Sequence, residues 1–145
     1  MIQEALTYND VLLVPQYSDV RSRNEVRLTS NLSDNQFGLP IIASPMDTIS
    51  ESDMAVAMAQ HGGLAIVHRY NSIHEQRLHC DKASLRGATV GAAIGTSGDY
   101  LDRATALYAA GVRILCVDVA HGHHILMKEA LTKLGQAFDY NDHIM

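Results

Sequence analysis

Four short apolar runs at regular intervals are the feature that most constrains what this chain can fold into. The runs are continuous rather than alternating, and they recur about every 23 to 25 residues, at positions 41–44, 64–68, 89–94 and 113–118. Strands buried on both faces of a parallel sheet have this pattern, whereas half-buried strands alternate. Because the gaps between the runs have helical periodicity, strand and helix alternate four times, which favours parallel βα units in an α/β fold.

The gaps themselves predict four helices. Ser50 and Asp53 have the Ser-x-x-acid spacing of a capping box ahead of an apolar stretch, and Gly62 suits the end of that first helix. The stretch after the fourth run has apolar residues at helical spacing, which indicates an amphipathic helix. The other predictions are a polar helix over 73–82 and helices over 99–110 and 127–138.

Composition limits the classes of function. The 145 residues are 47% hydrophobic and 19% charged, as in one soluble globular domain with a real core. The chain has 11 Lys and Arg against 16 Asp and Glu, without a basic stripe, so we expect no nucleic-acid partner. The apolar runs are too short to span a bilayer, and the N-terminus lacks the basic and apolar regions of a signal peptide. We therefore expect no membrane partner and a cytoplasmic location.

Residues 1–40 do not share the βα rhythm. This segment is mostly polar and loop-like apart from a short apolar stretch at 11–15. We interpret it as an N-terminal arm, laid against the bottom of the βα domain or against a neighbouring molecule. Residues 41–145 then form the βα domain, and the last few residues resemble the start of a further strand rather than the end of a chain.

Residues capable of chemistry follow each of the four apolar runs. In parallel α/β folds, ligands bind at the carboxyl ends of the strands, so we expect a site assembled from these loops. Asp118 ends an apolar run, where a carboxylate needs a partner. It suits a ribose hydroxyl or a cofactor ring as well as it suits the cap of the next helix, and the sequence leaves both possibilities open. The residues at these ends include Ser44, Met46, Asp47, His68, Arg69, Asp118 and the stretch 119–124.

Several common motifs are absent or weak. Gly95-x-x-Gly98 opens a helix and has backbone amides for an anion, but neither a P-loop nor the dinucleotide fingerprint is present. The histidines of 121–124 are not at the spacing of a metal site and lack a second ligand set, so we expect no metal. Cys116 is interpreted as an inert buried thiol. Cys80 has Lys82 and a histidine nearby that could lower its pKa, yet we expect neither cysteine to be a nucleophile.

Five segments, in the right order along almost the whole chain, resemble motifs of the IMP dehydrogenase/GMP reductase family. The third contains the Ser-Pro-Met-Asp-Thr sequence at 44–48. The first departs from the family at Asn9, where Asp, Ser or Lys is more usual. The segments are Leu6–Pro15, Ser22–Val26, Ala43–Thr48, Gly62–Arg69 and Val117–His123.

The resemblance implies a (β/α)8 TIM barrel, a fold of about 250 residues. The chain resembles its N-terminal half only, with about four βα units and the N-terminal arm. The family's catalytic Gly-Ser-x-Cys-Thr loop, and the potassium site of its dehydrogenases, are expected beyond Met145. We therefore expect no catalytic residue in this chain, which alone should be inactive.

The resemblance also implies roles for individual residues. Ser44, Met46 and Asp47 would contact the purine nucleotide, IMP or GMP. The cofactor would be NAD or NADP, which the sequence does not distinguish, and the full-length protein would be a homotetramer. The residues implied in cofactor binding are Asp118, Val119 and Ala120 along the cofactor, with His68 at the same end of the strands. In the reductase branch, Ser22, Arg23 and Arg69 would also touch the cofactor phosphates.

Two branches of the family fit. The variants Ser-Pro-Met-Asp, Gly-Gly-Leu and Ala-His-Gly-His favour an IMP dehydrogenase, which converts IMP, NAD and water to XMP and NADH. Only about twenty residues separate His68 from Thr89. The paired CBS modules of most dehydrogenases are therefore absent, which also fits a GMP reductase that converts GMP and NADPH to IMP and ammonia. The alternatives from other classes are a non-catalytic half-barrel binding or regulatory module and a flavodoxin-like domain that binds a mononucleotide.

Overall fold

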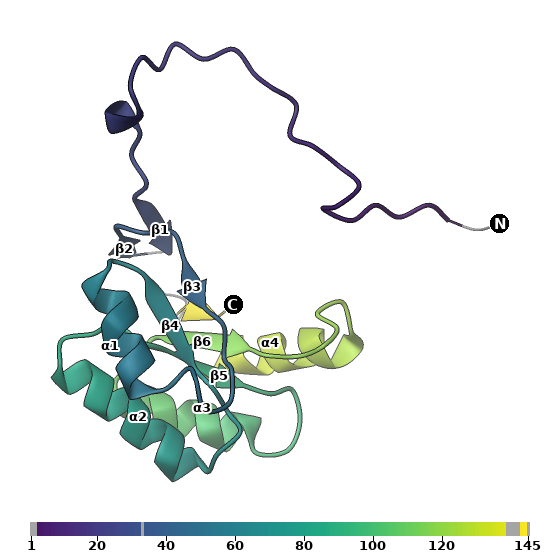
Figure 1. Ribbon diagram of the computed structural model, residues 1–145. Coiled ribbons are helices and arrows are strands. Elements are labelled where there is room, and N and C mark those ends of the chain that lie inside the picture. Colours follow the sequence, from purple (N-terminus) through teal and green to yellow (C-terminus); the bar gives the residue numbers. More distant parts are fainter. Residues whose placement is uncertain (1–2, 33, 139–142, 145) are drawn as a thin grey trace.

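Parallel strands and intervening helices alternate through most of the chain, as Figure 1 shows for the computed structural model. The structure describes residues 3–32, 34–138 and 143–144. A 3-10 turn at Arg23–Glu25 and a hairpin precede the βα units. The strands are β1 (Ser30–Leu32), β2 (Asn35–Phe37), β3 (Ile42–Ala43), β4 (Leu64–Val67), β5 (Gly91–Ile94), β6 (Ile114–Val117) and β7 (His143–Ile144). The helices are α1 (Ser52–Gln60), α2 (Ile73–Leu85), α3 (Tyr100–Ala109) and α4 (Ile125–Ala137).

Strands β3 to β7 form one sheet whose spatial order is the same as their order in the chain. Every neighbouring pair is parallel, as in the register of Ile42 with Leu64 and of Gly91 with Ile114. An α/β fold with a parallel sheet is thereby confirmed. A flavodoxin-like sheet reverses its strand order at a switch point. Because the described strands show no such reversal, the flavodoxin-like alternative is wrong. In the same residues the sheet does not close into a barrel.

The central strands of the sheet, β4 to β6, are buried on both faces. On one face, side chains that include Val67, Ile94 and Leu115 pack against the helices in the main core. On the other face, Leu64, Ile66, Ala93 and Ile114 form a second, smaller cluster. All four residues of β4 and of β5 are buried. This two-sided burial explains the continuous apolar runs at 64–68, 89–94 and 113–118. The prediction is wrong for the run at 41–44, because β3 lies at the edge of the described sheet, where Ile41 and Ile42 are 53% and 47% exposed.

The four predicted helices are present, but the start of the first differs from the prediction. The Ser50 hydroxyl donates to the carbonyl of Ser44 instead of capping α1, so the capping box predicted at Ser50 is wrong. A capping box does exist at Ser72 and Glu75, where it starts α2. The longest helices, α2 and α4, have 13 residues each. None of the helices in the described residues has the length and hydropathy needed to cross a membrane.

Gly62 ends the first helical unit, as the sequence predicts. Its φ of +79° follows the α1 C-cap at His61, a conformation that glycine adopts without strain. A side chain at Gly62 would also lie 3.2 Å from the Cα of Gly38. This close approach brings the chain that leaves the hairpin against the turn that enters β4.

Among the described residues of the N-terminal segment, the hairpin and the chain just after it contact the domain, where the Leu39 N–H donates to the Gly62 carbonyl at 2.9 Å. Leu32 and Phe37 pack against the smaller apolar cluster of the sheet. Residues 3–29 instead run away from the sheet, as Figure 1 shows, and side chains such as Tyr8 and Leu13 are 97% exposed. The expected contact with the chain's own domain is therefore found for the hairpin and not for residues 3–29. Contact of the arm with a neighbouring molecule stays a prediction.

Candidate functional site

The loop after β3 presents three of the predicted site residues to solvent. Ser44, Met46 and Asp47 are all exposed, and Met46 has 53% of its surface accessible. The loop closes on itself, because the backbone N–H of Ser50 donates to the Met46 carbonyl at 2.9 Å. Thr48, inside the loop, has a φ of +59°, a conformation that β-branched residues rarely adopt. The geometry leaves the hydroxyl, thioether and carboxylate side chains of the loop available to a ligand.

His68 lies beneath this loop at the end of β4 and is only 2% exposed. Its backbone N–H donates to the Ser50 carbonyl at 3.1 Å. Its ring Nδ1 accepts from the backbone N–H of Tyr70 at 3.2 Å, which places the ring hydrogen on Nε2. Nε2 faces Glu51 Oε1 at 3.3 Å and Asp47 Oδ1 at 3.8 Å. The structure therefore uses His68 to hold the loop.

Arg69 and Asp118, predicted separately as cofactor-binding residues, are brought together. The Arg69 Nη2 donates to the Asp118 carbonyl at 3.1 Å, and Nε lies 3.4 Å from the carboxylate Oδ2. That second contact has the distance of an ion pair but not the alignment of a hydrogen bond, so the buried Nε is left without a hydrogen-bond partner in the described residues. The Arg69 side chain passes Gly95, where a Cβ would lie 3.5 Å from Nη1. Each side chain remains about one-third exposed.

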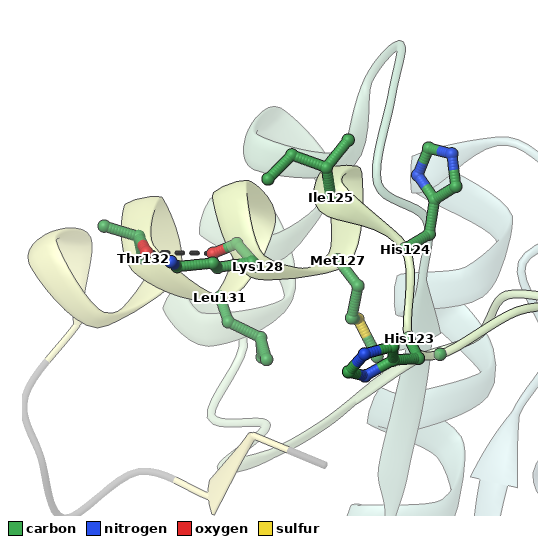
Figure 2. A pocket seen from close by; sticks show the side chains of 8 residues that line it. His123, His124, Ile125, Met127, Lys128, Leu131 and Thr132 are labelled. Atoms are coloured by element: carbon green, nitrogen blue, oxygen red, sulfur yellow. Dashed lines mark hydrogen bonds between the residues drawn. The ribbon is translucent and has the colours of Figure 1, made fainter.

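The segment after Asp118 forms two cavities beside α4. Val119, which is half-buried, lines a cavity of about 230 Å³, whereas Ala120 is exposed. A larger, open cavity of about 670 Å³ lies where the loop enters α4. Figure 2 shows the side chains that line it. His124 caps that helix, because its Nδ1 accepts from the Leu126 N–H at 3.1 Å. The larger cavity is lined by Gly122, His123, His124, Ile125, Met127, Lys128, Leu131 and Thr132.

Ser22 and Arg23 are not brought to the other predicted residues. They belong to the exposed arm, at the 3-10 turn, where the Ser22 hydroxyl accepts from the Asn24 N–H at 3.3 Å. Figure 1 shows this part of the chain well away from the sheet. A role for either residue in cofactor binding stays a prediction.

Neither cysteine is placed as a nucleophile. Burial, and to a smaller extent the charge of Asp81, raises the pKa of Cys80 to about 12. The idea that neighbouring cations lower this pKa is therefore wrong. Cys116, in β6, is partly buried, and this burial, followed by the charge of Asp118, raises its pKa as well. Both thiols are protonated at neutral pH. Among the residues that the structure describes, no three His, Cys, Asp or Glu side chains are grouped to hold a metal ion.

A buried polar network beneath the site has no counterpart in the sequence predictions. Gln76 is fully buried, and its Nε2 donates to the carbonyls of Val67 at 3.2 Å and Ala93 at 2.8 Å. Arg103 donates to Gln76 Oε1 at 2.9 Å and to Asp99 Oδ2 at 2.7 Å. The network joins α2 and α3 to the ends of β4 and β5. Two signals could have indicated it: the i, i+4 spacing of the Asp99–Arg103 pair, and a glutamine one helical turn before the buried Cys80.

Comparison with known proteins gives the family. Residues 5–145 match the IMP dehydrogenase / GMP reductase domain. The chain is 46% identical over 89 residues to an inosine-5'-monophosphate dehydrogenase of Nitrosopumilus maritimus, covering 61% of this chain and 19% of that protein. It is 53% identical over 76 residues to a GMP reductase of Leishmania donovani, covering 52% and 15%. It is 30% identical over 183 residues to an inosine-5'-monophosphate dehydrogenase of Borreliella burgdorferi, covering 91% and 45%.

The chain thus spans less than half the length of each of these relatives. The family match nevertheless covers nearly all of the chain, from the exposed arm through every βα unit described above. The segments that suggest the family in the sequence lie within the matched residues. This chain belongs to the IMP dehydrogenase/GMP reductase family.

Proposed function

We propose that this chain supplies the nucleotide-binding part of a purine-nucleotide oxidoreductase, and that the reaction is the IMP dehydrogenase reaction, IMP with NAD and water to XMP and NADH. The observation that carries this proposal is the arrangement of the strand ends. The exposed loop of Ser44, Met46 and Asp47 and the Arg69–Asp118 pair lie at the same, carboxyl edge of one parallel sheet. That edge is where α/β folds bind their ligands.

We further propose that residues 41–145 form the first half of a (β/α)8 barrel, with residues 1–40 as its N-terminal arm. Two features support this. The strands are ordered as in the chain, and the helices pack on one face while a compact apolar layer fills the other. The inner layer is tight at Gly91, where a Cβ would clash with Ile66 Cδ1 and lie 3.2 Å from Ile114 Cγ2. A barrel interior is filled by side chains in this way.

The loop after β3 has the chemistry that a purine nucleotide needs. The exposed thioether of Met46 offers an apolar, polarisable surface for the base. The Ser44 carbonyl already accepts from the Met46 N–H at 2.9 Å and from the Ser50 hydroxyl. The exposed Ser44 hydroxyl is then the group that meets the ligand. Asp47, with 62% of its side chain exposed, can accept from a sugar or a base N–H.

The part of the carboxyl edge around Arg69 and Asp118 suits a nicotinamide cofactor. Asp118 offers a partly exposed carboxylate for a ribose hydroxyl, and the Nε of Arg69, which makes no hydrogen bond in the described residues, offers a buried donor beside it. Val119 and Ala120 continue along the same edge. When bound, the cofactor supplies hydride chemistry, as NAD or as NADP. Ser22 and Arg23 reach its phosphates only if the arm folds back or comes from a neighbouring subunit, which is consistent with the proposed homotetramer.

The catalytic cysteine must come from elsewhere. Neither Cys80 nor Cys116 is ionised at neutral pH, and neither lies in a Gly-Ser-x-Cys-Thr segment. We propose that such a segment, together with any potassium site, lies outside these 145 residues. This chain then binds and orients the reactants in a cytoplasmic enzyme, with no membrane or nucleic-acid partner.

A GMP reductase is the second candidate. One observation favours it: α2 alone connects β4 and β5, so no inserted module lies between them. A non-catalytic binding or regulatory module is the alternative outside the enzymes, and it predicts nucleotide binding without turnover in any assembly.

The test is nuclear magnetic resonance titration of the protein with IMP, GMP and, as a control, AMP at millimolar concentrations, followed by NAD. We expect IMP to shift the amides of residues 44–48 and NAD those of 118–120. Assays of IMP with NAD and of GMP with NADPH, made on a complete enzyme that also contains the catalytic cysteine, then choose the branch. Equal shifts with AMP, or shifts confined to other parts of the chain, would contradict the proposed sites.

A further inference from the structure

Glu51 occupies the position of a helix cap without acting as one. It is the N-cap residue of α1, yet its side chain makes no capping hydrogen bond. Its Oε1 instead lies 3.3 Å from Nε2 of His68 and 3.9 Å from Nε2 of His79. One histidine comes from the end of β4 and the other from within α2. A single carboxylate oxygen therefore meets two imidazoles from two different elements.

His79 makes the capping hydrogen bond that Glu51 does not make, and His68 holds Glu51 itself. Nδ1 of His79 accepts from the backbone N–H of Ser52 at 3.5 Å, so α1 is capped from the neighbouring helix. The hydrogen on Nε2 of His68 faces Glu51, with Asp47 on its other side at 3.8 Å. Both ends of the segment from Asp47 to Glu51 are thus anchored on one buried ring.

The loop held in this way needs an anchor. Thr48 keeps a φ of +59°, which costs free energy for a β-branched residue unless the surroundings impose it. Within the loop, Ser50 closes the turn through its hydroxyl to the Ser44 carbonyl and through its N–H to Met46. The bond from the His68 N–H to the Ser50 carbonyl at 3.1 Å then ties the turn to β4. Glu51 follows Ser50 directly, so its attachment to His68 fixes the end of the turn.

We propose that Glu51 is a positioning residue, whose carboxylate, held between His68 and His79, fixes the loop that presents Ser44 and Met46. The loop's order then sets the affinity for the purine nucleotide. That last consequence rests on the proposed function, whereas the fixing of the loop does not.

The test separates this role from helix capping. Serine is a preferred N-cap residue, so a capping role predicts that Glu51→Ser keeps or improves the order of this region. The serine side chain is too short to reach His68, and our proposal predicts about tenfold faster amide hydrogen exchange at Ser50 and His68, the effect of one lost charge-assisted hydrogen bond. Glu51→Gln keeps an acceptor oxygen and should restore exchange to within about threefold of the parent.

The matched control is Asp53→Asn, which removes an acid two residues along the chain. Asp53 is 93% exposed and pairs with Arg86 outside the loop. In the Asp53→Asn variant we expect amide hydrogen exchange at Ser50 and His68 to be as slow as in the parent protein. If Glu51→Ser does not fold, Glu51→Asp, another good N-cap with a shorter reach, gives the same comparison. Unchanged exchange in the serine or aspartate variant would overturn the proposal.

Titration of the same proteins with IMP tests the consequence for binding. We expect Glu51→Ser to weaken the IMP-induced shift of the Met46 amide several-fold, and Glu51→Gln and Asp53→Asn to leave it near the parent value. If the parent shows no IMP shift while Glu51→Ser accelerates exchange, the proposed function fails and the positioning of the loop by Glu51 stands. If IMP binds the parent and exchange in Glu51→Ser is unchanged, the proposed function stands and the positioning role fails.

Discussion

Replacing Arg103 by methionine should destabilise the fold far more than the same change at Arg86. Both arginines pair with an aspartate at nearly equal distance, 2.7 Å for Arg103–Asp99 and 2.8 Å for Arg86–Asp53. They differ in burial: the side chain of Arg103 is 8% exposed, whereas that of Arg86 is 54% exposed. The comparison therefore isolates what burial adds to an Arg–Asp pair.

The expected magnitude follows from the bonds that each change removes. Arg103→Met leaves the buried Gln76 Oε1 without its donor, a loss of about 1–3 kcal/mol, and removes the hydrogen bond to the Asn71 carbonyl, about 1 kcal/mol. Asp99 is 53% exposed and rehydrates, so its pairing adds less than about 1 kcal/mol. We expect a total of about 3 kcal/mol, against at most about 0.5 kcal/mol for Arg86→Met, which is exposed on both sides.

Urea denaturation followed by circular dichroism at neutral pH measures both changes. The small Arg86 contribution should disappear in 1 M salt, where screening acts within about 3 Å, while the Arg103 contribution should persist. Equal losses for the two variants, or a loss below about 1 kcal/mol for Arg103→Met, would refute the argument that the buried network holds α2 and α3 to the strand ends.

Three other expectations concern single sites. Because burial raises the pKa of Cys80 to about 12, iodoacetamide at pH 8 should leave this thiol unlabelled in the folded protein. Mass spectrometry measures the labelling, and rapid labelling would show that the site opens. Gly135→Ala, within α4, should raise the unfolding free energy by about 0.5–1 kcal/mol, because alanine favours a helix and its Cβ meets no other atom. Gly63→Ala should lower the unfolding free energy by about 1–3 kcal/mol, because the new Cβ would lie 2.9 Å from the Ile41 carbonyl oxygen. Hydrogen bonds from the Ser72 side chain and backbone lower the pKa of Glu75. The ionised Glu75 therefore stabilises the fold at any pH above its ordinary pKa, and this stabilisation is lost as the pH falls through the lowered, folded-state pKa. In Ser72→Ala the unfolding free energy should fall less steeply on the acid side, and an unchanged pH dependence would contradict the capping box.

The sheet could be predicted from the sequence because its central strands, β4 to β6, are buried on both faces. Continuous apolar runs of four to six residues between glycines are typical of such strands, and the regular spacing leaves room for one helix between each pair. Glycines such as Gly62 and Gly111, both at positive φ, end the first and third helices where the sequence predicts. These are local features, determined by a few neighbouring residues.

The interactions that were not predicted depend on how the chain folds back on itself. The Ser-x-x-acid pattern at Ser50 indicates a cap, but the Ser50 hydroxyl has a better acceptor in the Ser44 carbonyl, which only the folded turn provides. Arg103 and Gln76 are 27 residues apart and meet because α2 and α3 pack side by side. The spacing of Asp99 and Arg103 and the position of Gln76 could have indicated polar residues at these helices, but the pairing of Gln76 with Arg103 depends on how the helices pack.

The Arg69–Asp118 pair, at the carboxyl edge of the sheet, is another interaction between residues far apart in the chain. Sequence reasoning treats these two residues as independent contacts to a cofactor, whereas the structure makes each the other's partner across Gly95. The Arg69 guanidinium donates to the Asp118 backbone carbonyl at 3.1 Å, and its Nε lies 3.4 Å from the carboxylate, so this ion pair draws the carboxylate toward Arg69 before any ligand arrives. A pre-oriented group loses less conformational entropy on binding than a free one. Arg69 can therefore contribute to the affinity for a ligand of Asp118 without touching that ligand.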